Sequence, residues 1–198
     1  MMKRTFSTKL LFDTHGRVHN YLRISLTEKC NLRCHYCMPA EGVELSPTEI
    51  SKTEIIRLAK IFQSLGVQKV KLTGGEPAVR HDIVDIVTEL KPLFNEIGIT
   101  TNGTLLKRKL PKLVDAGLTH VNVSLDSLVA AKNEFITRRP STTEAALNTI
   151  DRCIEANLVT KLNVVAMKNF NDDEFCDFVD LTKERNLAVR FIEFMPFG

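Results

Sequence analysis

The 198-residue sequence has no long apolar run and no large excess of either charge. No apolar stretch approaches the length of a membrane span, so we expect no transmembrane segment and no membrane partner. There are 27 Lys and Arg against 24 Asp and Glu, and the net charge of +3 does not by itself indicate nucleic acid. With 43% apolar and 26% charged residues, the composition is that of one ordinary globular domain.

Cysteine is scarce and unevenly placed. The chain has five cysteines, an odd number, and three of them (Cys30, Cys34 and Cys37) lie within eight residues. No apolar signal peptide precedes them. These features disfavour a secreted disulfide scaffold, and we expect a reducing compartment.

The start of the chain lacks acidic residues. It contains Lys3, Arg4 and Lys9 but no Asp or Glu before Asp13. This composition is typical of an organelle transit peptide, and a basic, frayed N-terminus explains it equally well. We expect residues 1–12 to be an N-terminal extension or transit-peptide remnant and residues 13–198 to form one core domain.

Six β-rich runs alternate with five stretches that have apolar residues at helical spacing. The expected strands are 21–27, 67–74, 96–102, 120–126, 160–167 and 188–195, and the expected helices are 53–66, 82–94, 106–117, 143–157 and 172–186. Repeated β-α units predict an α/β fold with parallel strands. Periodicity does not decide between an open doubly wound sheet and a barrel.

Unusual residues follow five of the expected strands. "CNLRCHYCMP" (30–39) follows the first, "TGGEP" (73–77) the second, "TTNG" (100–103) the third, "SLD" (124–126) the fourth and "FMPFG" (194–198) the sixth. Ligands of α/β proteins bind at the carboxyl ends of the strands. We therefore expect one site distributed over these loops.

The spacing of Cys30, Cys34 and Cys37 admits three kinds of site. A structural zinc site needs a fourth ligand, for which His35 or a distant cysteine is available. A redox pair of Cys34 and Cys37 leaves Cys30 unexplained. Three thiolates on a cluster with four irons leave one iron open to a substrate or cofactor.

The C-x3-C-x2-C pattern with Tyr36 before the last cysteine, followed by "LTGGEP" (72–77), resembles the radical S-adenosylmethionine superfamily. The resemblance implies a partial (β/α)6 TIM-like barrel. It implies that Cys30, Cys34 and Cys37 bind a [4Fe–4S] cluster whose open iron takes S-adenosylmethionine. Gly74 and Gly75 would let the backbone approach the methionyl part of that cofactor, and Glu76 would accept from its ammonium.

The wording of six segments narrows the resemblance to the GTP 3′,8-cyclase family, closest to its eukaryotic branch. They are "YLRISLTEKCNLRCHYCMP", "VKLTGGEP", "TTNG", "VNVSLDSL", "KLNVVAMK" and "VRFIEFMPF". The resemblance implies a lyase for the first step of molybdenum cofactor (molybdopterin) biosynthesis. In that reaction the deoxyadenosyl radical removes the C3′ hydrogen of GTP, and the ribose radical then attacks C8 of guanine to give (8S)-3′,8-cyclo-7,8-dihydroguanosine 5′-triphosphate.

The resemblance also assigns binding residues. The S-adenosylmethionine site would include Tyr36, Gly75, Ser124 and Met195, and the GTP site Arg23, Lys71, Thr100 and Lys161. Bases on strands suit this assignment, because a triphosphate needs converging cations and a buried, unpaired base is costly. Further residues expected in the same ring are Asn102, Asp126, Lys69 and Arg190. Cys153 and Cys176 are expected to be buried core thiols, and His35 an exposed loop residue.

Further expectations come from the family's other properties. The family carries a second cluster beyond the sixth strand, so we expect one cluster here and impaired cyclisation by this chain. Expected partners are GTP, a cyclic pyranopterin monophosphate synthase acting downstream, an unidentified electron donor and a second copy in a homodimer. The expected location is the mitochondrial matrix, with the cytoplasm as the alternative. Another radical enzyme and a non-catalytic product remain as alternative functions.

Overall fold

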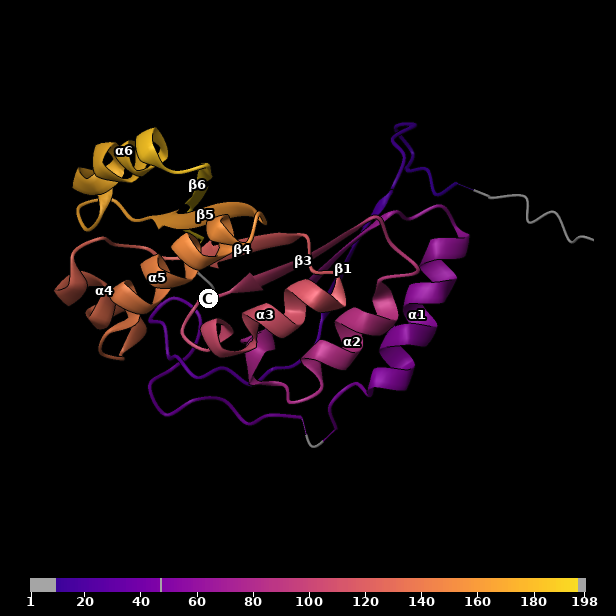
Figure 1. The fold of residues 1–198 in the computed structure, drawn as a ribbon. Helices are drawn as coiled ribbons and strands as arrows, with labels where there is room; N and C mark the ends of the chain where they lie inside the picture. The colour runs from indigo at the N-terminus through magenta and orange to yellow at the C-terminus, as the bar shows by residue number, and fades with distance from the viewer. Residues whose placement is uncertain (1–9, 47, 196–198) are drawn as a thin grey trace, which may run out of the picture.

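One curved sheet of six parallel strands organises the molecule (Figure 1). The computed structural model describes residues 10–46 and 48–195. The strands are adjacent in chain order: β1 (Tyr21–Ser25), β2 (Lys69–Thr73), β3 (Glu96–Thr101), β4 (His120–Ser124), β5 (Val159–Ala166) and β6 (Leu187–Glu193). The predicted α/β fold with parallel strands is confirmed, and the barrel-like order excludes a doubly wound sheet.

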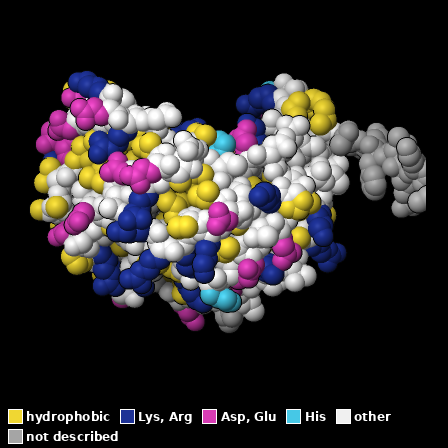
Figure 2. All heavy atoms as spheres, viewed as in Figure 1, with side chains coloured by type: hydrophobic (Ala, Val, Ile, Leu, Met, Phe, Trp, Pro, Cys, Tyr) yellow, Lys and Arg dark blue, Asp and Glu magenta, His cyan; other side chains and the backbone are white. Residues whose placement is uncertain are grey.

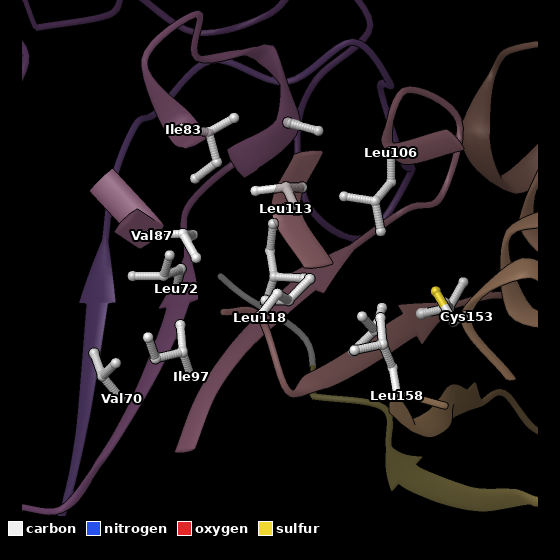
Figure 3. Close-up of a cluster of buried hydrophobic side chains, with 14 of the residues drawn as sticks. Val70, Leu72, Ile83, Val87, Ile97, Leu106, Leu113, Leu118, Cys153 and Leu158 are labelled. Atoms are coloured by element: carbon white, nitrogen blue, oxygen red, sulfur yellow. The ribbon is translucent and has the colours of Figure 1, made fainter. Parts of the chain in front are cut away.

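Helices cover one face of this sheet. They are α1 (Lys52–Ser64), α2 (Ile83–Leu90), α3 (Leu106–Ala116), α4 (Ala130–Thr137), α5 (Thr142–Glu155) and α6 (Phe175–Glu184), with short 3-10 turns at Pro77–Val79 and Asp172–Glu174. Their apolar sides pack on alternate strand residues such as Val70, Leu72 and Ile97, as Figure 3 shows. Burying one face of each strand in this way fixes which residues point to the other face.

Local sequence explains where several helices begin and end. Ser51 caps α1 by accepting from the backbone N–H of Glu54, whose side chain accepts from Ser51 in return. Gly117 ends α3 with a φ of 106°, a left-handed conformation that glycine adopts without strain. These signals are local, so the sequence predicts these helices.

The helix α4 was not expected, because the contacts that fix the turn before it come from far along the chain. Its N-cap residue Val129 has no side-chain cap of its own. Instead the buried carboxylate of Glu174 accepts from the N–H groups of Leu128 (2.7 Å) and Val129 (3.3 Å) and from the hydroxyl of Ser127 (2.8 Å). Glu174 thus holds the turn of residues 127–129 that leads into α4, and it lies 45 positions after Val129 in the chain.

The two cysteines outside the motif have different environments. Cys153 on α5 is fully buried in the core beside Leu158, which confirms that expectation (Figure 3). Cys176 on α6 is exposed, so its expected burial was wrong. Apolar residues at 175, 176, 178 and 179 offer α6 two adjacent apolar sides, and the structure fully buries only Phe178.

Near the ends of the described chain, apolar surface is exposed. Phe191 and Ile192 on β6 are each 40% accessible. Residues 1–9 of the expected extension lie outside the described residues, and Phe12 already forms an antiparallel bridge with Val18. Among the described helices, none combines the length and apolarity needed to cross a membrane.

Candidate functional site

The face of the sheet without helices is polar, which sets the position of the functional residues. Strand register places Arg23 beside Lys71, and Lys71 beside Gly98. Because alternate strand residues share a face, the side chains at positions 23, 71, 122 and 161 point away from the helices. Figure 2 shows a hollow at the top of the molecule, between the α6 region and the segment near residues 10–20.

The cysteine loop (residues 30–39) follows β1, and the segment 27–29 that leads into it is packed tightly against "GGEP". The N–H of Gly75 donates to the carbonyl of Thr27 (2.7 Å), and the N–H of Glu76 donates to that of Lys29 (2.8 Å). A Cβ atom on Gly75 would lie 2.4 Å from the Lys29 oxygen. Glycine is therefore required there, because the two backbones touch.

The three thiols of the loop influence one another. Cys30 and Cys34 are half-buried and Cys37 is exposed. Burial is the main cause that raises the pKa of the Cys34 thiol to about 12, and Asp126 and the other two cysteines add to the shift. Burial likewise raises the pKa of Cys30. The neutral forms of Cys30 and Cys34 are thus favoured as long as no metal is bound.

This donor set fits an iron–sulfur cluster better than a single ion. Across residues 10–46 and 48–195, no three His, Cys, Asp or Glu side chains converge closely enough to hold one metal ion. A four-iron cluster takes each thiolate on a different iron, so the thiols of Cys30, Cys34 and Cys37 need not meet at one point. The zinc interpretation, with His35 as fourth ligand, therefore lacks geometric support. His35 is exposed, as expected, and stacks on Phe135 with ring centroids 4.6 Å apart.

Tyr36 joins the cysteine loop to the ends of β4 and β5. Its hydroxyl donates to the Asp126 carboxylate (2.7 Å), which also accepts from the N–H of Val165 (2.8 Å). Burial raises the pKa of Asp126, and burial together with that carboxylate raises the pKa of Tyr36. Tyr36 therefore braces the loop from within.

Glu76 is buried rather than turned toward solvent. Its carboxylate accepts from the N–H groups of Ala78 (2.9 Å) and Asn102 (2.7 Å) and from the Thr101 hydroxyl (2.8 Å). It is 1% exposed, and burial raises its pKa against these donors. The residue ties the "GGEP" turn to the end of β3, so an ammonium would reach it only if this network opened.

Other predicted residues lie at the same carboxyl ends of the strands. The Asn102 amide donates to the Asn31 side chain (2.9 Å), and its nitrogen is 3.9 Å from the Cys30 sulfur. Ser124 ends β4 and is half-buried. Met195 is 61% exposed just beyond β6, next to Phe194, whose ring lies edge-on to Tyr36 at 6.4 Å. These residues surround the cysteine loop.

The predicted basic residues form a second, separate level. A cavity of about 390 Å³ lies near the amino-terminal halves of the strands. Its basic lining residues are Arg23, Lys69, Lys71, Lys161 and Arg190, and we call it the basic cavity. The expectation that Lys69 and Arg190 share one ring with Asn102 and Asp126 was therefore wrong. Thr100 lies between the two levels, opposite Asn122 on β4.

Lys71 is the most constrained member of the basic cavity. It is 9% exposed, and its ammonium donates to the Asn122 side chain (3.0 Å). Its pKa is lowered to about 8, chiefly by burial and then by the charges of Arg190, Lys161 and Arg23 in that order. A Cβ on Gly98 would lie 2.6 Å from the Lys71 nitrogen, so this glycine provides the space that Lys71 occupies.

The acidic lining residue Glu96 neutralises only some of the bases of the basic cavity. Glu96 pairs with Lys69 (2.6 Å) and lies 3.6 Å from the His120 ring. The Arg190 guanidinium donates to the Asn163 amide oxygen (2.6 Å), a neutral partner. Arg23, Lys71, Lys161 and Arg190 make no salt bridge within the described residues. Such a group suits a polyanion such as a triphosphate.

Sequence reasoning missed several lining residues of the basic cavity. Tyr21, Glu96, Gly98, His120 and Asn122 were not proposed, although their strand positions follow the alternation that places Arg23 and Lys71 on this face. That alternation, combined with parallel register, was a usable signal.

Comparison with known proteins accounts for the cysteine loop. Residues 24–182 match the family model of the radical SAM superfamily. The chain belongs to the radical SAM superfamily. Two solved structures share the fold. Streptococcus suis SuiB bound to S-adenosylmethionine has a TM-score of 0.73 at 20% identity, over 90% of this chain and 41% of SuiB. Native anSMEcpe with bound AdoMet has a TM-score of 0.72 at 15% identity, over 89% of this chain and 52% of its own. They support the partial TIM-like barrel.

Curated relatives are much more similar in sequence. The chain is 54% identical over 193 residues to "GTP 3′,8-cyclase, mitochondrial" of Arabidopsis thaliana, covering 95% of this chain and 49% of that protein. It is 48% identical over 195 residues to "GTP 3′,8-cyclase" of Listeria monocytogenes, covering 96% and 58%. It is 53% identical over 192 residues to "Molybdenum cofactor biosynthesis protein 1" of Drosophila melanogaster, covering 95% and 34%. The chain thus spans about a third to six tenths of these relatives' lengths.

Proposed function

We propose that this radical SAM chain acts in the first step of molybdenum cofactor biosynthesis, the conversion of GTP to its 3′,8-cyclised dihydro derivative. The observation that carries the proposal is the basic cavity, which shares the polar face of the sheet with the cysteine loop. The names of the relatives, at 48–54% identity, give the same reaction.

The residues divide into two sets with different tasks. Cys30, Cys34 and Cys37 would hold a [4Fe–4S] cluster, which when bound supplies the electron that cleaves S-adenosylmethionine. Tyr36, Gly74, Gly75, Glu76, Ser124 and Met195 would shape the cofactor site: Gly74 and Gly75 by close backbone approach, Tyr36 and Glu76 by bracing the loop. Arg23, Lys71, Thr100 and Lys161 would bind GTP.

The two levels explain how a long substrate would lie. Cations in the basic cavity would hold the triphosphate, with Arg23 and Arg190 available for two-pronged contacts with phosphate oxygens. The ribose would then extend toward the carboxyl ends of the strands and the cofactor. Holding the phosphates away from the reacting carbon fixes the ribose without placing negative charge beside the radical.

We also propose a downstream enzyme, an electron donor, a location and an oligomeric state for this chain. The product would pass to a cyclic pyranopterin monophosphate synthase, and an electron donor would serve the cluster. The Arabidopsis relative's name supports a mitochondrial location, for which we propose the matrix. A homodimer is the proposed assembly. Each of these can be tested separately from the reaction.

An isotope experiment tests the reaction. The chain would be reconstituted with iron and sulfide without oxygen, then given S-adenosylmethionine, dithionite and GTP deuterated at C3′. We expect about four irons per chain and deuterium in the 5′-deoxyadenosine. Iron binding with deuterium-free 5′-deoxyadenosine would indicate a radical SAM enzyme for another substrate, and a screen of peptides and nucleotides would follow.

A further inference from the structure

Two basic segments contact the cysteine loop. On one side the Asn31 amide donates to the Thr104 hydroxyl (2.7 Å), two residues before α3 begins. On the other, the Arg138 guanidinium donates to the carbonyls of Arg33 (3.0 Å) and Met38 (2.9 Å), just after α4. The start of α3 and the junction of α4 and α5 therefore border the loop.

The three segments are basic without any acid. Residues 29–39, 102–112 and 135–142 contain eight Lys and Arg and no Asp or Glu, although the whole chain has 24 acids. Figure 2 shows Lys and Arg, in dark blue, gathered at the lower left, where Figure 1 places the start of α3 and the α4–α5 junction. Lys107, Arg108 and Arg139 are exposed.

The bases at the start of α3 are placed against local preference. Lys107, Arg108 and Lys109 occupy its first turn, which contains no acid. The positive end of the helix dipole disfavours cations there. In the described part of the chain, no salt bridge involves Lys107, Arg108 or Arg139. Folding does not explain these charges, whereas an anionic partner would.

An exposed aromatic lies beside the basic border. Phe135 on α4 is 59% accessible and stacks on His35 of the cysteine loop. The Arg138 guanidinium lies 3.1 Å from the same His35 ring. Exposed aromatic and arginine side chains are the residues enriched at the centres of protein interfaces.

We propose that this face, formed by Lys107, Arg108, Arg139 and Phe135 around the outer side of the cysteine loop, docks a small acidic protein that carries one electron. The inference rests on the proposed function, because an iron–sulfur cluster that gives up one electron per cleavage must be reduced again. The transfer balances simply: the carrier loses one electron, the oxidised cluster gains it, and no bond forms or breaks. Charge complementarity would speed the encounter, as it does for other oppositely charged partners.

A binding experiment with two charge reversals tests the surface. The probe is a purified acidic [2Fe–2S] ferredoxin, added to the wild-type chain and to Lys107→Glu/Arg108→Glu. The matched control is Arg57→Glu/Lys60→Glu, which reverses two exposed bases on α1, at the other end of the sheet. At about 50 mM salt we expect at least tenfold weaker binding for the α3 variant alone, with the difference shrinking at about 500 mM.

Failure to fold cannot produce this result. Acids in the first turn of a helix are favourable, so Lys107→Glu/Arg108→Glu should unfold at the wild-type temperature or above it. Equal weakening by both variants, or no binding by the wild type, would overturn the proposal. So would binding of a single-stranded oligonucleotide through Lys107 and Arg108 in place of ferredoxin.

A second measurement separates this proposal from the proposed function. The reconstituted protein would be reduced either by dithionite or by reduced ferredoxin, and the bleaching of the cluster followed by stopped flow. We expect the α3 variant to match wild type with dithionite and to be at least tenfold slower with ferredoxin. No cluster or no S-adenosylmethionine cleavage with dithionite would refute the function, whereas equal ferredoxin rates would refute only the docking surface.

Discussion

Replacing Lys71 by Met removes one charge from the basic cavity and tests its electrostatics. Met has a similar length and no charge, and it fits the space left by Gly98. Burial and the three neighbouring bases depress the pKa of Lys71 from 10.5 to about 8. That depression means that the folded chain holds the protonated amine at a free-energy cost.

The cost in folding free energy follows from the difference between the pKa of Lys71 in the folded and in the unfolded chain. The depression corresponds to about 3 kcal/mol, and solvent in the open cavity reduces it to about 1–3 kcal/mol. Loss of the hydrogen bond to Asn122 offsets about 1 kcal/mol of any gain. The destabilisation is fully present below pH 8 and is relieved as pH rises from about 8 toward 10.5, where the folded chain has lost the proton that the unfolded chain still holds.

Urea unfolding at several pH values checks this prediction. At pH 7, Lys71→Met should be as stable as wild type or up to about 2 kcal/mol more stable. The stability of Lys71→Met relative to wild type should fall between pH 8 and pH 9.5. It should drop below that of wild type if the lost Asn122 hydrogen bond outweighs the charge cost that remains. Lys60→Met, an exposed residue on α1, is the control and should show no such trend. A difference that stays constant from pH 7 to pH 9.5 would refute the assigned charge state.

Three further predictions concern the cysteine loop. Gly75→Ala should lower the free energy of unfolding by about 1–3 kcal/mol and reduce iron incorporation, because the added methyl group would meet the Lys29 carbonyl. Unchanged stability in urea would show that the two backbones can separate. Tyr36→Phe should lower the free energy of unfolding by about 1–3 kcal/mol and raise the pKa of Asp126 further, since the buried carboxylate loses one of its two donors. Denaturation between pH 4 and pH 8 measures both effects. A variant as stable as wild type would contradict the bracing role of Tyr36. The Cys→Ser variants at 30, 34 and 37 should lose iron. Cys153→Ser should keep iron but lose about 1–3 kcal/mol of unfolding free energy, and Cys176→Ser should keep both iron and stability. Iron retained after Cys34→Ser would refute the ligand set.

Local patterns predicted most of the fold and only part of the site. All six strands lie where alternating apolar runs placed them, and α1 and α3 follow their own caps. The helix α4 was missed because the turn that leads into it is held by Glu174, 45 positions after Val129 in the chain. Such a contact exists only once β5 and the turn after it have folded.

The arrangement of the site depends on how neighbouring strands are aligned with each other, and the sequence alone does not predict that alignment. Motifs at the strand ends predicted the neighbours of the cysteine loop, because parallel strands bring their ends together. Lys69 begins β2 and Arg190 lies at the middle of β6, so they line the basic cavity instead of that ring. The role of Gly98 becomes visible only through its contact with Lys71 from the neighbouring strand.

The central claim is that the basic cavity binds the triphosphate of the substrate, and nucleotide binding tests it most directly. Equilibrium dialysis without oxygen would compare GTP, GMP and guanosine with the wild-type chain, Lys161→Ala and the control Lys60→Ala. We predict that GTP binds at least tenfold more tightly than guanosine, and that Lys161→Ala removes most of this difference while Lys60→Ala keeps it. Equal affinity for GTP and guanosine, or an unchanged preference in Lys161→Ala, would contradict the account.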